Sequence, residues 1–197
     1  MIREAWGQML ARSITDPASV ARALLSLGLA RHVLWTGLVL AAVLNTLIFS
    51  LSNMLFAGGM GVMPGLFGTP VGYLVMMLGG LVLTVAALTL AGRMLGGQGR
   101  LDDVLVVVLW LQVLRVLVQI VTLILALAIP ALAVMGVFVA TLVGLYIMVH
   151  FVNQAHRLES LPKAAGVLLL SVLLMAVALY LLIALVGGTI LGTTAHV

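Results

Sequence analysis

Five long apolar runs dominate this chain, and each is long enough to cross a membrane as a helix. A hydrocarbon core about 30 Å thick takes about 20 helical residues. Of the 197 residues, 64% are hydrophobic and only 7% are charged, far from the usage of soluble domains. The apolar runs cover residues 33–55, 71–92, 104–128, 132–151 and 165–187. The sequence therefore predicts an all-α integral membrane protein with five transmembrane helices.

The prolines and the short links support unbroken helices. All five prolines lie outside the apolar runs, at Pro17, Pro64, Pro70, Pro130 and Pro162. Because proline disrupts a helix interior, this placement favours helices over the strands of a barrel. The link at Pro130 is only a few residues long, so the third and fourth spans should be antiparallel neighbours. Residues 56–70 are rich in glycine and carry no charge, which predicts a flexible outer loop or a shallow re-entrant segment.

The charged residues predict the orientation of the spans. Thirteen of the fourteen charged side chains can be placed on one side of the membrane. The basic residues on that side are Arg3, Arg12, Arg22, Arg31, Arg93, Arg100, Arg157 and Lys163. The first link, the third link and the C-terminal tail carry no lysine or arginine, so the positive-inside rule predicts a cytoplasmic N-terminus and an outer C-terminus. The positive charge thus indicates topology rather than nucleic-acid binding.

The chain divides into an N-terminal segment, residues 1–32, and a transmembrane domain, residues 33–197. Apolar residues recur at helical spacing from Ile2 to Ile14. This pattern predicts an amphipathic helix in the cytoplasmic interface, with Trp6, Arg3 and Arg12 in contact with lipid. The alternative is a helix packed beneath the bundle. Asp16 and Pro17 are typical of an N-cap and a first helical residue, and they predict a second short helix to about Gly28.

Several segments resemble the bacterial branch of the Yip (Ypt-interacting protein) family. They are Thr15-Asp16-Pro17, Ala21-Arg22-Ala23-Leu24-Leu25-Ser26-Leu27-Gly28-Leu29, Trp35, Gly96-Gly97-Gln98-Gly99-Arg100, Asp102-Asp103, Trp110-Leu111-Gln112 and Phe151-Val152-Asn153-Gln154-Ala155-His156-Arg157-Leu158-Glu159-Ser160-Leu161. The resemblance implies a five-span domain with a cytoplasmic N-terminus. Eukaryotic relatives bind prenylated Rab-type GTPases, but this chain lacks their long N-terminal region and its Asp-Leu-Tyr-Gly-Pro motif. Rab binding is therefore not expected. The arginine-rich composition indicates a bacterial source, and hence the inner membrane.

Arg115 is the one charged residue inside an apolar run. A charge at this depth costs about 2.5 to 3.5 kcal/mol on insertion scales. It shares a helix face with other polar residues, and no span contains an Asp or Glu to pair with it. Asn45 and Thr46 of the first span, Thr84 of the second and Thr141 of the fourth lie at similar depth. We take the intramembrane polar site to be Gln112, Arg115, Gln119, Thr122 and Asn45.

Three interpretations of Arg115 are open. It is a structural residue paired with amides and hydroxyls of the bundle, it meets an acidic group on a partner helix, or it faces an anionic headgroup or substrate in a cavity. We slightly favour the partner helix over the anion.

A row of small residues, Gly136, Ala140 and Gly144, predicts close helix packing along the fourth span. The contact lies either within the bundle or between copies. The four histidines do not share a face suited to a metal, and we expect them to be satisfied at the interface. With no cysteine, and no nucleophile or carboxylate constellation, the sequence predicts neither a metal site nor an enzyme, and it requires no cofactor.

Two functions remain. The first is a Yip-type membrane organiser or accessory subunit that contacts lipids and either a membrane protein partner or a second copy. The second is a small carrier or channel with an anion-facing Arg115.

Overall fold

The computed structural model describes residues 2–56 and 69–191, and these residues form seven helices without a strand. The helices are α1 (Ile2–Thr15), α2 (Pro17–Ser26), α3 (Arg31–Leu55), α4 (Pro70–Met94), α5 (Leu101–Ala128), α6 (Pro130–His156) and α7 (Leu161–Leu191). The last five are long and apolar enough to cross a membrane. Each apolar run of the sequence lies within one of them, which confirms the all-α fold class with five candidate spans. Most of the glycine-rich loop expected at 56–70 lies outside the described residues.

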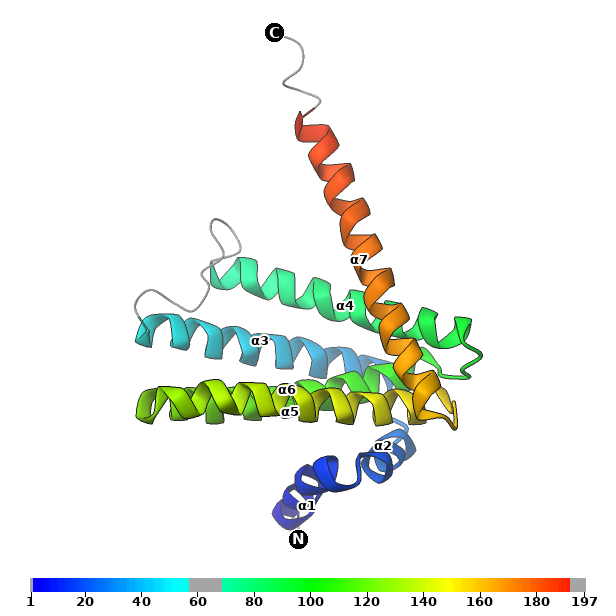
Figure 1. The fold of residues 1–197 in the computed structure, drawn as a ribbon, viewed down its shortest axis with the longest axis horizontal. Helices are drawn as coiled ribbons and strands as arrows, with labels where there is room; N and C mark the ends of the chain where they lie inside the picture. Colours follow the sequence, from blue (N-terminus) through cyan, green and yellow to red (C-terminus); the bar gives the residue numbers. More distant parts are fainter. Residues whose placement is uncertain (1, 57–68, 192–197) are drawn as a thin grey trace.

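Helices α3, α4, α5 and α6 run side by side (Figure 1). The α4–α5 and α6–α7 links lie at one end of this bundle, together with the start of α3, and we call it the basic end because Arg31, Arg93, Arg100 and Arg157 lie there. The α5–α6 link lies at the opposite end. Helices α5 and α6 are antiparallel neighbours, as the short link at Pro130 predicts.

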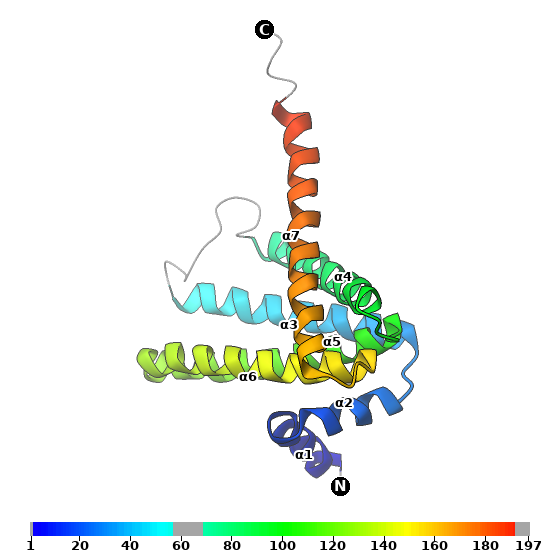
Figure 2. The ribbon, with the colours of Figure 1, turned by 45° about the vertical axis from the view of Figure 1, so that its right-hand side comes forward.

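Helix α7 departs from the bundle. Its first part packs against α4 and α6, and the rest crosses away from the other helices (Figures 1 and 2). From Val177 to Leu185 nearly every described side chain is exposed. The chain therefore has a four-helix bundle with a fifth apolar helix attached mainly at the basic end.

Local sequence signals explain where the helices begin. Proline occupies the first turn of α2, α4 and α6, where its missing N–H removes no helical hydrogen bond. The Asp16 side chain accepts a hydrogen bond of 3.1 Å from the Ser19 amide, which confirms the predicted N-cap of α2. That backbone hydrogen bond, aided by the Ser19 side chain, holds the pKa of Asp16 below its usual range.

The tightly packed core lies in the basic half of the bundle. Its fully buried side chains include Leu34 and Leu38 of α3, Leu88 of α4, Leu105 of α5 and Phe151 of α6. The opposite halves of α5 and α6 are mostly exposed. Packing therefore fixes the helices at the basic end and leaves the other half open.

Helices α1 and α2 lie against the flank of this bundle, next to α5 and α6 (Figure 2). Trp6 of α1 stacks on Trp110 of α5, with ring centroids 5.7 Å apart. Arg31 makes a bidentate ion pair with Asp102, at 2.7 and 3.1 Å, which ties the start of α3 to the start of α5. The two short helices therefore contact the bundle, and their contact with lipid stays a prediction.

Candidate functional site: an apolar cavity beside Arg115

A cavity of about 1120 Å³ opens in the loosely packed half of the bundle. It is lined mainly by α3, α5 and α6, together with Tyr73 of α4 and Leu10 and Ile14 of α1. Most of the lining is apolar, as in sites that hold a hydrophobic ligand or helix. The lining therefore suits an apolar occupant.

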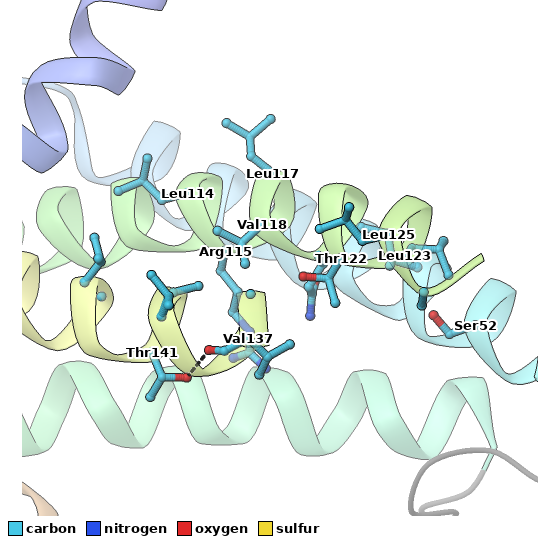
Figure 3. A pocket seen from close by; sticks show the side chains of 18 of the residues that line it. Ser52, Leu114, Arg115, Leu117, Val118, Thr122, Leu123, Leu125, Val137 and Thr141 are labelled. Atoms are coloured by element: carbon cyan, nitrogen blue, oxygen red, sulfur yellow. Dashed lines mark hydrogen bonds between the residues drawn. The ribbon is translucent and has the colours of Figure 1, made fainter. Parts of the chain in front are cut away.

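Three residues of the predicted polar row line this cavity, namely Arg115, Gln119 and Thr122 (Figure 3). Arg115 lies fourteen residues after the start of α5 at Leu101 and thirteen before its end at Ala128. The guanidinium extends from α5 towards α6 (Figure 3). Thr141 of α6 also lines the cavity and adds a hydroxyl. The polar groups thus gather near the middle of an otherwise apolar opening.

Within the described residues, Arg115 has neither an ion pair nor a hydrogen bond. The hydroxyls that the sequence offered as acceptors bond to their own helices instead. Thr46 donates to the Ala42 carbonyl, Thr84 to Gly80 and Thr141 to Val137, at 2.9, 2.7 and 2.8 Å. The interpretation of Arg115 as a residue paired within the bundle therefore finds no support in these contacts.

Asn45 and Gln112 lie apart from the cavity. Asn45 is fully buried, and its Nδ2 donates to the Ala41 carbonyl at 2.8 Å. The Oδ1 of Asn45 and the Oε1 of Gln112 are buried without a hydrogen-bond partner among the described residues, as is the Oε1 of Gln119. The structure therefore brings together three of the five predicted polar residues, and their role in binding stays a prediction.

The small residues of α6 line the same cavity. Gly136, Ala140 and Gly144 all face it. A Cβ added at Gly144 would meet no atom within 4 Å, and one at Gly136 would lie 3.9 Å from Leu125 Cδ1. The row therefore leaves room beside α6 within the chain, and close packing with a further helix stays a prediction.

The predicted interfacial residues are spread over α1. Trp6 is 52% exposed beyond its stack on Trp110, and Arg12 is exposed. The side chain of Arg3 lies outside the described residues. The structure thus leaves Trp6 and Arg12 free to meet lipid.

Comparison with protein families matches the Yip1 domain over residues 11–190. The chain belongs to the Yip1 domain family. This confirms the resemblance to the Yip family, and it makes the protein a Yip1-family multi-pass membrane protein whose helices contact lipid. No curated protein and no solved structure shows significant similarity to the chain.

The structure of this Yip1 domain corrects one prediction about its histidines. His156 is not an interfacial residue with satisfied nitrogens, because it is fully buried and neither ring nitrogen has a hydrogen-bond partner among the described residues. Tyr146 and His150 of α6 lie side by side, with their rings edge-on and the centroids 4.7 Å apart. No group of His, Cys, Asp and Glu suited to a metal occurs in the described ranges.

Sequence reasoning missed His156 because the residues that bury it come from another part of the chain. Gly92, Gly97 and Gly99 of the α4 end and the α4–α5 link surround its ring. The one available signal was the cluster of glycines in Gly96-Gly97-Gln98-Gly99.

Proposed function

We propose that this Yip1-family protein is a non-enzymatic membrane organiser or accessory subunit that receives a transmembrane helix of a partner protein in the cavity beside Arg115. The observation that carries this proposal is an unpaired guanidinium in an apolar cavity. At the middle of α5 a lone arginine is costly, and a carboxylate on an entering helix would offset that cost. The expected partner helix is therefore apolar, with an Asp or Glu near its midpoint.

The row of small residues on α6 supports a helix as the occupant of the cavity. Gly136, Ala140 and Gly144 let a second backbone approach α6 closely, and van der Waals contact at such rows drives helix association in lipid. The apolar lining from α3 and α5 suits the rest of a membrane helix. We place the basic end in the cytoplasm of a bacterium and the protein in its inner membrane, in accord with the positive-inside rule.

Photo-crosslinking tests this function at two neighbouring positions of α6. A photoreactive amino acid at Val139, which lines the cavity, should crosslink a specific membrane protein in cells. The matched control is Phe138, which is 66% exposed and lies outside the cavity lining. Arg115→Leu should abolish the Val139 crosslink, whereas Arg115→Lys should keep part of it because the charge remains. An unchanged crosslink in folded Arg115→Leu would contradict the proposal.

A second function is a small carrier or channel for an anion. The observation in its favour is that hydroxyl and amide groups of Thr122, Thr141 and Gln119 line the same cavity as Arg115. Purified protein in liposomes should then conduct or exchange a radiolabelled anion, and Arg115→Leu should abolish this flux. Flux without a Val139 crosslink would favour the carrier over the organiser.

A further inference from the structure

The ring of His156 is enclosed by three glycines at the basic end. A Cβ on Gly92 or on Gly99 would overlap the imidazole, and a Cβ on Gly97 would lie 2.8 Å from His156 Cβ. Such distances are shorter than van der Waals contact, so only glycine leaves space for this ring. His156 is the last residue of α6, whereas the glycines come from the end of α4 and the α4–α5 link. The ring therefore packs the end of α6 against the α4–α5 link.

Hydrogen bonds hold the same two links together. The Gln98 amide donates to the His156 carbonyl at 2.9 Å. Arg157, in a left-handed conformation with φ of 53°, donates from Nη1 to the Gln98 carbonyl at 3.3 Å. Its Nη2 lies 3.6 Å from Asp103 Oδ2 at the start of α5. The enclosed ring is thus the centre of a joint between α4, α5 and α6.

This enclosure suits a neutral ring and opposes a charged one. Neither nitrogen of His156 has a hydrogen-bond partner among the described residues, and the Leu88 carbonyl beside the ring lies outside hydrogen-bond geometry. The charged groups that act on the ring are Asp103 of α5 and Arg93 of α4. Asp103 already accepts a hydrogen bond of 3.0 Å from the Arg100 amide. It also pairs with Arg157, the residue that follows His156. An imidazolium would therefore be a buried charge, with no acceptor in hydrogen-bond geometry for either N–H group among the described residues.

We propose that His156 is a proton-sensitive latch between the α4–α5 and α6–α7 links. The neutral ring keeps the Gly96–Arg100 link closed, and protonation releases the ring to water and opens the link. The direction of the pH dependence follows from linkage, because the open form of the link binds a proton on His156 that the closed form excludes. Closure is complete at high pH and is lost as the pH falls below about 6.5, where an ordinary histidine takes up a proton. This latch does not depend on the partner helix proposed for the cavity.

Hydrogen exchange of the Gln98 amide tests the latch directly, since this amide donates across the joint. The protein is measured in lipid nanodiscs from about pH 8 to pH 5, the range in which histidine titrates. Protection factors, which correct for the intrinsic pH dependence of exchange, should fall about tenfold for each pH unit below about 6.5. A flat profile in the unmodified protein would overturn the proposal.

Two variants assign the pH dependence to His156. In His156→Phe an apolar ring fills the space without titrating, and the profile should be flat. A changed buried residue can prevent folding, so the second variant keeps His156 and combines His32→Gln, His150→Gln and His196→Gln, which leaves one histidine. This variant should keep the full pH dependence. Loss of the dependence in the second variant, or its survival in folded His156→Phe, would exclude the latch.

Discussion

The indole Nε1 of Trp110 donates a hydrogen bond of 2.9 Å to the hydroxyl of Ser13, and both residues are buried. This bond joins α5 to α1 across nearly a hundred residues of sequence. The Ser13 hydroxyl donates in turn to the Met9 carbonyl at 2.8 Å. Because Leu10 and Ile14 of the same helix line the cavity, the bond also holds α1 beside it.

Removing the acceptor should loosen α1. Ser13→Ala leaves the buried indole N–H of Trp110 unpaired, at a cost of about 1 to 3 kcal/mol. We expect the free energy of opening of α1, measured by amide hydrogen exchange in nanodiscs, to fall by that amount. Ser26→Ala is the matched control, because the exposed Ser26 hydroxyl bonds only to the Ala23 carbonyl of its own helix. Equal effects of the two substitutions would show that the Trp110 bond does not hold α1.

The space beside Gly92 should be filled by His156 and by nothing else. Gly92→Ala places a methyl group on the imidazole and should destabilise the fold by about 1 to 3 kcal/mol through overpacking. In a His156→Ala background the same change should cost less than about 1 kcal/mol, because the ring is gone. The measurement is a double-mutant cycle on unfolding in detergent mixtures. Additive effects of Gly92→Ala and His156→Ala would contradict the packing of the His156 ring against Gly92.

The N-cap of α2 should weaken in acid. The hydrogen bond from the Ser19 amide lowers the pKa of Asp16, so the folded helix favours the carboxylate. The stabilisation is complete above the ordinary pKa of about 3.9 and is lost as the pH falls through the lower value of the folded state. Hydrogen exchange of the Ser19 amide should show this loss in the unmodified protein. Asp16→Asn keeps an acceptor without a titrating group and should be insensitive to pH in this range.

Much of the fold follows from the sequence because its signals are local. A helix in lipid satisfies its own backbone, so a long apolar run is enough to predict a span. The N-cap at Asp16 likewise depends on residues three positions apart. The departure of α7 from the bundle was not predictable in this way, since its apolar residues face all sides and do not favour one packing surface.

Predicting the two sites would have required knowing how the helices are placed relative to one another, and no single segment of the sequence encodes this. The polar row at Arg115 and the small row at Gly136 were each visible as a helix face, but only the rotation of α5 and α6 brings both to one cavity. The hydroxyls expected around Arg115 bond to carbonyls four residues earlier, an acceptor that every helix offers. The enclosure of His156 joins residues about sixty positions apart, and the sequence shows glycines and a histidine without showing that they meet.

Filling the cavity should separate partner binding from stability. Gly144→Leu places its side chain where an added Cβ meets no atom within 4 Å, so the fold should keep its stability. Replacing a helical glycine also removes a propensity penalty of about 1 kcal/mol, which favours α6. The bulky side chain would nevertheless block close approach of a second helix and abolish the Val139 crosslink. Gly79→Leu on α4 is the control, because it too has open space but lies outside the cavity lining. A Val139 crosslink that persists in folded Gly144→Leu would mean that the partner helix does not occupy this cavity.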